Sequence, residues 1–224
     1  MTIRENRPRP TEAQIKALSG HPTGFLADAM DGTGAMAPEI KSVAPGVLPS
    51  NMCGPVLTCD AGPADNMAVL AAITEVASGD IVVSASGNWR QCAVVGDRMM
   101  GMLRNAGASG FVTDGLVRDI EGLIPVGLPI FCTGLSPNSP SSKGPGSVGE
   151  PVQVGGVTIS SGDVLVSDDN GVVIVPFARI DAVIERLETV EKLERGLDAN
   201  IQAGLAIPDS IRDLVKSSAV KRVR

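Results

Sequence analysis

Residues 56–85 read VLTCDAGPADNMAVLAAITEVASGDIVVSA, and the first fold prediction comes from this stretch. Two short runs of β-branched and small apolar side chains, Val56-Leu-Thr-Cys59 and Asp80-Ile-Val-Val-Ser-Ala85, are typical of buried strands. Between them, residues 64–76 place apolar side chains at helical spacing. A strand, a helix and a second strand in this order predict a β-α-β unit with parallel strands.

The same alternation continues toward the C-terminus. Residues 96–105 have helical periodicity, residues 111–113 favour a short strand, a further helix is expected to begin near Val117, and residues 128–132 again favour a strand. This order of elements predicts an α/β fold with a sheet that is at least partly parallel.

Residues 135–149 interrupt the alternation. They are rich in Ser, Pro and Gly, and a loop of this length inside a compact domain is usually a lid, a binding loop or disordered. We favour a lid or an inter-subunit loop, with disorder as the alternative. Beyond it, residues 152–159 and 164–175 surround the turns Gly155-Gly156 and Asn170-Gly171. These turns predict two antiparallel hairpins that complete a mixed parallel and antiparallel sheet.

Helices are expected at both ends of the chain. Thr11-Glu-Ala-Gln14 is a capping-box pattern that opens a helix to about Leu18, and a second apolar-periodic stretch covers residues 24–30. A long charged helix is expected at about residues 178–197 and a shorter one near 210–217. We interpret the chain as one domain, residues 1–224, with an N-terminal helical cap at 1–50, an α/β core at 51–177 and C-terminal helices at 178–224.

Composition and charge narrow the class of protein. Hydrophobic residues make up 43% of the 224 residues but aromatic residues only 2%, so an aliphatic core of buried strands is expected. The formal net charge of -6 would repel a phosphate backbone, which argues against nucleic acid as a partner. The N-terminal residues carry charges and no segment has the ~20 apolar residues of a membrane span, so we expect a cytoplasmic protein without a membrane partner.

Side chains that bind soft metal ions are scarce. The four cysteines lack paired metal-ligand spacing, and we expect reduced, mostly buried thiols. His21 is the single histidine, which argues against a histidine-rich zinc site. Any metal ion bound by this chain is therefore expected to have oxygen ligands.

Two polar clusters lie where predicted strands end and predicted helices begin. One spans residues 87–99 and the other residues 113–119. Because ligands in open α/β sheets bind at the carboxyl ends of the strands, the two helix starts are expected to share one crevice. Gly96 would let an anionic ligand approach the amides of Arg98 and Met99 at the first helix start.

The charged residues of the two clusters suit a carboxylate and a hard cation. Arg118 offers a planar guanidinium of the kind that clamps carboxylates. Asp97 and Asp119 supply the oxygen ligands that Mg²⁺ prefers. Helix capping is the simpler alternative for both aspartates, because acidic residues favour the first turn of a helix.

The spacing of these residues resembles a known signature. Asp97 is followed by twenty residues and then by Arg118-Asp119, which is similar to the signature of the RraA-like family. That family takes in the regulator of ribonuclease activity A and the 4-hydroxy-4-methyl-2-oxoglutarate aldolases. Flanking stretches extend the resemblance from about residue 20 to about residue 205, and they are Asp28-Ala-Met30, Gly54-Pro-Val-Leu-Thr58, Asp65-Asn66, Gly79-Asp-Ile-Val-Val83, Thr113-Asp-Gly115, Gly155-Gly156 and residues 162–172.

The resemblance implies a fold, an assembly and an activity. The implied fold is a swivelling β-α-β layered domain that forms homotrimers or homohexamers with sites at subunit interfaces. The implied protein is a divalent-metal-dependent lyase, which cleaves a 4-hydroxy-2-oxo acid or oxaloacetate to pyruvate through a metal-stabilised enolate. The implied cofactor is Mg²⁺ or Mn²⁺, and the implied partner is a small 2-oxo acid substrate.

The resemblance also implies roles for the matching residues. Arg118 would bind the oxo acid and stabilise its enolate, Asp97 would orient a metal-bound water as acid and base, and Asp119 would hold the metal ion. Near Gly96, the amides of Arg98 and Met99 would bind the substrate carboxylate. A glutamate of the neighbouring subunit would complete the surroundings of the site, and Glu194 is the best match.

Two other functions are considered. The chain could be a non-catalytic protein-binding regulator of a ribonuclease, since the signature occurs in both branches of the family. A methyltransferase using S-adenosylmethionine should have a Gly-rich loop after the first strand, and Asp60-Ala-Gly-Pro63 is a poor version of it. No lysine lies in a context suited to Schiff-base chemistry, so we reject an imine mechanism.

The chain departs from the family at Arg98 and Met99, where the family often has leucines. Trp89, within the first cluster, is a further bulky addition. Lys143 is the only cation of the 135–149 loop. We hypothesise that Lys143 or Arg98 holds a distal carboxylate of the substrate.

Overall fold

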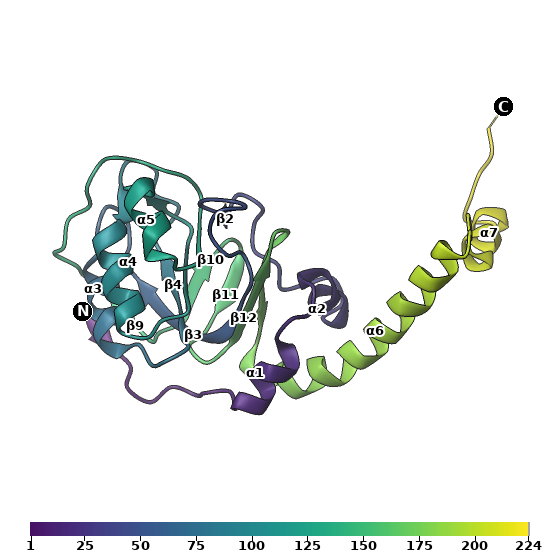
Figure 1. Ribbon diagram of the computed structural model, residues 1–224, viewed down its shortest axis with the longest axis horizontal. Coiled ribbons are helices and arrows are strands. Elements are labelled where there is room, and N and C mark those ends of the chain that lie inside the picture. The colour runs from purple at the N-terminus through teal and green to yellow at the C-terminus, as the bar shows by residue number, and fades with distance from the viewer. Residues whose placement is uncertain (224) are drawn as a thin grey trace.

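The computed structural model describes residues 1–223, and its main sheet is centred on four parallel strands (Figure 1). In spatial order these are β3 (Met52–Asp60), β4 (Ile81–Ala85), β6 (Gly110–Thr113) and β8 (Ile130–Cys132). The predicted β-α-β unit is confirmed, because β3 and β4 pair in parallel from Val56 opposite Ile81 to Asp60 opposite Ala85.

Three helices cover one face of this sheet, as the left half of Figure 1 shows. They are α3 (Met67–Glu75), α4 (Asp97–Asn105) and α5 (Ile120–Val126), and α4 packs beside α5. Met100 of α4 and Leu123 of α5 are fully buried in one apolar cluster with Phe111 of β6. Aliphatic side chains dominate this cluster, as the low aromatic content predicts.

The two predicted hairpins form on the other face, but only one of them joins the main sheet. That hairpin is β12 (Val164–Asp168) with β13 (Gly171–Val175), and β12 pairs antiparallel with β3. The other, β10 (Val152–Val154) with β11 (Val157–Ile159), pairs only within itself. The prediction that both hairpins complete the sheet is therefore wrong. The β10–β11 hairpin instead buries its apolar side chains against the face of the sheet.

The outermost layer consists of helices from both ends of the chain. α1 (Glu12–Leu18), α2 (Thr23–Ala29) and the start of α6 (Ile180–Gln202) pack on the outer face of β12 and β13. The predicted capping box is confirmed at Thr11. After a 3₁₀ turn at Phe177–Arg179, α6 projects away from the body and leads to α7 (Asp209–Lys216) (Figure 1).

Several strands of two or three residues were not predicted from the sequence patterns. The edges of the main sheet hold β1 (Thr2–Ile3), β9 (Ser147–Val148) and β2 (Lys41–Ser42), while β5 (Ala93–Val95) and β7 (Leu116–Val117) form a small parallel pair. The helix expected near Val117 starts at Ile120. Val117 belongs to β7, and the left-handed backbone of Asp119 keeps that residue out of the helix.

All four cysteines are free thiols, and Cys59, Cys92 and Cys132 are buried while Cys53 is half-buried. The expected burial of most of the thiols is confirmed. Burial raises the pKa of the Cys59 thiol to about 12, so this sulfur is not a reactive nucleophile. Within residues 1–223, no helix has the length and apolar character needed to cross a membrane.

Candidate active site

The short strands β5 and β7 bring two helix starts together. Gly96 follows β5 and precedes α4, while Asp119 follows β7 by two residues and precedes α5. Because Ala93 pairs with Leu116 and Val95 pairs with Val117 in parallel, both strands deliver their helices to the same edge. Unpaired amides at helix starts attract anions, so this edge is electrostatically suited to carboxylates.

A cavity of about 760 Å³ lies at this edge. Its lining includes all six site residues predicted from the two polar clusters: Gly96, Asp97, Arg98, Met99, Arg118 and Asp119. Glu194 is not among the lining residues, because it belongs to α6 on the opposite side of the body (Figure 1).

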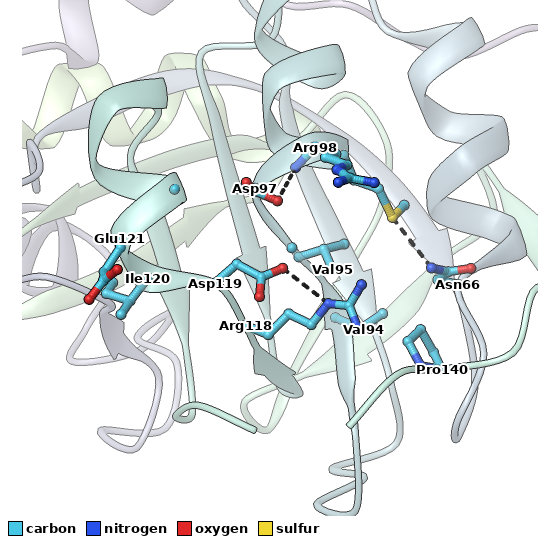
Figure 2. A pocket seen from close by; sticks show the side chains of 13 residues that line it. Asn66, Val94, Val95, Asp97, Arg98, Arg118, Asp119, Ile120, Glu121 and Pro140 are labelled. Atoms are coloured by element: carbon cyan, nitrogen blue, oxygen red, sulfur yellow. Dashed lines mark hydrogen bonds and ion pairs between the residues drawn. The ribbon is translucent and has the colours of Figure 1, made fainter. Parts of the chain in front are cut away.

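Arg118 and Asp119 form an ion pair inside the cavity (Figure 2). Arg118 Nε lies 3.2 Å from Asp119 Oδ2, and Arg118 Nη1 donates a hydrogen bond to Ser139 Oγ. The two charged side chains are 35% and 48% exposed, respectively. Both therefore remain open to a ligand, and the pair itself contributes little to stability at this exposure.

The backbone of Asp119 is in the left-handed region, with φ 62° and ψ 48°. For a residue other than glycine this conformation costs about 1 kcal/mol, and such strain gathers at functional sites. It turns the carboxylate back over Gly96, where a Cβ atom would lie 2.7 Å from Asp119 Oδ2. The absence of a side chain at Gly96 therefore gives the Asp119 carboxylate its place.

Asp97 occupies the first turn of α4 and reaches across to α5. Its Oδ1 accepts a hydrogen bond of 2.7 Å from the Arg98 amide, and its carboxylate lies so close to Gly122 that a Cβ atom there would collide with it. One of the two amides predicted to bind a carboxylate is thus already engaged. A ligand that uses the Arg98 amide must first turn the Asp97 side chain away.

The side chains of the cavity fit a hard cation that takes most of its ligands from water or from a bound ligand, not from the protein. Within residues 1–223, no group of three or more His, Cys, Asp or Glu side chains is gathered to hold a metal ion. Mg²⁺ is commonly bound by one or two carboxylates, with water or ligand oxygens at its remaining positions. Asp119, with Asp97 in the same cavity, matches that arrangement.

The 135–149 loop forms one wall of the cavity through Pro140 and through Ser139, which accepts from Arg118. It is fixed to the start of α3 by Asp65, whose Oδ2 accepts from Ser141 Oγ at 2.6 Å and from the Lys143 amide at 2.8 Å. Burial alone would raise the pKa of Asp65, but these hydrogen bonds and others outweigh it and lower the pKa to about 2.

Six contributors to the cavity lie outside the two predicted polar clusters: Asn66, Ile120, Glu121, Gly122, Ser139 and Pro140. Asn66 Nδ2 donates to Met99 Sδ at 3.3 Å, and Gly122 makes room for Asp97. Asn66 lies in a stretch that resembles the family, which was the one available signal. Ser139 and Pro140 belong to the 135–149 loop, for which a lid or an inter-subunit loop is favoured. Ile120, Glu121 and Gly122 carry no local pattern that distinguishes them from ordinary helix residues.

The fold and the cavity together define a layered α/β protein with a polar site at two converging helix starts. The chain belongs to the RraA-like family, whose description is Aldolase/RraA and whose match covers residues 23–174. Members that are named as aldolases place this family among the lyases.

One relative and two solved structures show what this chain is similar to. A "Putative 4-hydroxy-4-methyl-2-oxoglutarate aldolase" from Halalkalibacterium halodurans is 34% identical, over 81% of this chain and 87% of that protein. An uncharacterized protein from Pseudomonas syringae has a crystal structure with a TM-score of 0.75 and 30% identity, over 90% and 97% of the two chains. The RNA-processing inhibitor RraA of Thermus thermophilis has a TM-score of 0.63 and 26% identity, over 70% and 93%.

Proposed function

We propose that this chain is a divalent-metal-dependent lyase that releases pyruvate from a 4-hydroxy-2-oxo acid or from oxaloacetate. The observation that carries the proposal is the convergence of Arg118, Asp119 and the start of α4 on one cavity. The relative named as an aldolase, with 34% identity, supports lyase chemistry at this cavity. Mg²⁺ or Mn²⁺, held by Asp119, would supply a Lewis acid for the negative charge of the enolate.

The residues of the chain have separate tasks in this proposal. The substrate carboxylate is bound by the Met99 amide, and by the Arg98 amide once Asp97 has turned away. Arg118 donates hydrogen bonds to the C2 oxygen of the substrate, on which negative charge develops. Asp97 accepts the proton of the 4-hydroxyl group, directly or through one water molecule.

Loss of that proton allows the bond between C3 and C4 to break. Its electron pair forms the enolate of pyruvate, whose oxygen faces Arg118, and the C4 fragment leaves as a carbonyl compound. Return of a proton to C3 gives pyruvate. Oxaloacetate reaches the same enolate when its C3–C4 bond breaks and carbon dioxide leaves, so one arrangement of residues serves both reactions.

A coupled pyruvate assay with and without Mg²⁺ tests the proposal, with Asp119→Gly as the matched variant. Glycine adopts the left-handed backbone of position 119 without strain, so the variant should unfold at the same temperature as the wild type. Its pyruvate production should fall by about 100-fold or more, because the metal ligand is lost.

Metal binding gives a second readout that does not depend on turnover. Mg²⁺ should raise the melting temperature of the wild type, because a ligand that binds only the folded state stabilises it. The Asp119→Gly variant should not respond. Pyruvate production that persists in excess chelator, or an undiminished Mg²⁺ effect in the variant, would contradict the proposal.

A non-catalytic regulator of a ribonuclease is the second candidate. The likeness to the RNA-processing inhibitor of Thermus thermophilis favours it, and so do exposed apolar side chains on the projecting helices, among them Leu193 and Leu214. A wild-type chain that captures a purified ribonuclease and releases no pyruvate from any 2-oxo acid would favour the regulator over the lyase.

A further inference from the structure

The guanidinium of Arg118 is held at two of its three nitrogens before any ligand binds. Nε lies 3.2 Å from Asp119 Oδ2, and Nη1 donates a hydrogen bond to Ser139 Oγ. Within residues 1–223, Nη2 makes no hydrogen bond. Figure 2 shows the guanidinium between Asp119 and Pro140, the neighbour of Ser139. Contacts that fix a long side chain in advance reduce the entropy lost when a ligand binds.

The loop that carries Ser139 begins beside β7, the strand that leads to Arg118. The Val117 amide donates to the Gly134 carbonyl oxygen at 3.0 Å, and the Ser136 amide donates to the Val117 carbonyl oxygen at 3.0 Å. Val117 also forms a parallel bridge with Leu135. The start of the loop is thus fixed to the same small pair of strands that brings Arg118 to the cavity.

Asn138 fixes the next part of the loop to β5, the other strand of that pair. The Ala93 amide donates to the Asn138 carbonyl oxygen at 3.0 Å, and Asn138 Nδ2 donates to the Gln91 carbonyl oxygen at 2.9 Å. Asn138 is exposed, so these two hydrogen bonds hold it in place and not burial. The loop therefore crosses from β7 to β5, and Ser139 follows directly after the second attachment.

The sequence of this crossing is stiff at every position except Asn138. Residues 136–140 read SPNSP. The two prolines have fixed φ angles, and each restricts the serine before it to an extended backbone. Asn138 is neither a proline nor followed by one, and it is the residue that the two hydrogen bonds to β5 fix. The hydroxyl of Ser139 is therefore presented to Arg118 by a backbone with little freedom.

We infer that Asn138 and Ser139 are positioning residues for Arg118. Asn138 fixes the loop on β5, and Ser139 fixes the guanidinium, which leaves Nη2 for the 2-oxo acid. Both residues act through Arg118, without touching the substrate. The inference deepens the proposed function, on which its turnover measurements rest.

Turnover tests the inference through a double-mutant cycle. Ser139→Ala should lower kcat by about 10-fold, because a hydrogen bond of the charged guanidinium is lost, whereas Ser139→Thr retains the hydroxyl and should stay within about 3-fold of the wild type. Asn138→Ala should lower kcat by about 5-fold alone and by less than about 2-fold in the Ser139→Ala background, because both changes break the same contact. Ser147 lies in the same loop, and its hydroxyl makes no hydrogen bond within the described residues, so Ser147→Ala is the matched control and should leave kcat unchanged.

Ligand binding distinguishes a residue that acts through Arg118 from one that touches the ligand. The probe is oxalate, a planar dianion that resembles the enolate of pyruvate, and calorimetry in the presence of Mg²⁺ measures its affinity. Ser139→Ala should weaken oxalate binding by about 5-fold when Arg118 is intact and by less than about 2-fold in the Arg118→Ala background. Equal losses in both backgrounds would overturn the inference, since Ser139 would then serve the ligand without Arg118.

The motion of Arg118 can also be measured without any ligand. Nuclear magnetic resonance relaxation of the arginine Nε–H groups reports their order, and the resonance of Arg118 is the one missing from Arg118→Ala. Its order parameter should fall in Ser139→Ala and in Asn138→Ala and keep the wild-type value in Ser147→Ala. Unchanged order in the first two variants would overturn the inference. A wild type that releases no pyruvate but shows these changes would refute the lyase and leave the positioning role standing.

Discussion

Gly96 shows how one absent side chain arranges the candidate site. A Cβ atom at this position would lie 2.7 Å from Asp119 Oδ2 and 3.1 Å from both Cγ and Nε of Arg118. The backbone of Gly96 is extended, with φ -139°, so an alanine would fit the main chain without strain. The conflict is therefore confined to the two charged side chains.

Gly96→Ala should damage activity much more than stability. The new methyl group would push the Arg118–Asp119 pair out of its position over α4, and such a displacement of about 1 Å can lower kcat/KM by ~100-fold. The melting temperature should change by no more than about 4 °C, because the pair is exposed and flexible. Steady-state pyruvate assays and thermal unfolding measure the two effects.

Gly101 provides the matched control in the same helix. A Cβ atom there would contact only Val126 Cγ2, at 3.9 Å, so the methyl group has room. Gly101→Ala should raise the free energy of unfolding by about 0.5–1 kcal/mol through helix propensity and leave activity unchanged. Equal losses of activity in Gly96→Ala and Gly101→Ala would show that displacement of the Arg118–Asp119 pair is not the cause.

Among single residues, the charged side chains of the candidate site could be predicted from the sequence, whereas the glycines that leave space for them could not. Asp97, Arg118 and Asp119 stand out because charged residues follow predicted strands at a recognisable spacing. Gly122 does not stand out, because the need for a glycine at this position arises only from where the Asp97 carboxylate lies after folding. Sequence patterns report local periodicity, and this contact joins two helices.

At the scale of elements, long periodic segments were predicted well and short ones were not. The β3-α3-β4 unit follows from hydrophobic spacing, and the two C-terminal helices lie close to their expected ranges. β5, β7 and β9 have two or three residues each, which is too few to show a period. Missing these strands matters, because β5 and β7 bring together the two helix starts that border the cavity. The 135–149 loop is fixed by individual polar contacts that periodicity does not report.

The contact between Asp65 and the loop predicts a dependence of stability on pH. The folded-state pKa of Asp65 is lowered to about 2, against about 3.9 in an unfolded chain. The carboxylate therefore adds stability above about pH 4, and this stability is lost as the pH falls toward 2. Between pH 5 and pH 3, the wild type should lose roughly 1 kcal/mol more than Asp65→Asn, as denaturant unfolding at each pH would show.

Asp169→Asn is the control for that measurement. Asp169 is exposed and its carboxylate accepts no hydrogen bond within the described residues, so its replacement should leave the pH dependence as in the wild type. Identical pH slopes for the wild type and Asp65→Asn would show that this carboxylate does not hold the loop. At neutral pH, Asp65→Asn should also lower kcat/KM by a few fold, because the loop carries Ser139 to Arg118.

At the scale of the molecule, the direction of α6 is set by its first turns. Ile180, Val183 and Leu187 are buried against α1, α2 and the β12–β13 hairpin. His21 Nδ1 lies 2.9 Å from Glu191 Oε1, which ties the next turn to the body. Beyond that point α6 runs away from its own cavity, and it presents exposed apolar side chains such as Leu193 and Ile201 (Figure 1).

Glu194 lies on this projecting part of α6, so it can serve a cavity only in another copy of the chain. If it completes the site of a neighbouring subunit, Glu194→Ala should lower turnover by about 10-fold or more without changing the melting temperature. Arg118→Ala should be inactive, because its own cavity lacks the guanidinium. Subunits of the two variants, unfolded and refolded together, should regain activity, because some cavities in the mixed assembly combine an intact Arg118 with an intact Glu194 from a neighbour. A mixture no more active than the separate variants, once subunit exchange has been verified by mass spectrometry, would mean that each cavity works without Glu194 from another chain.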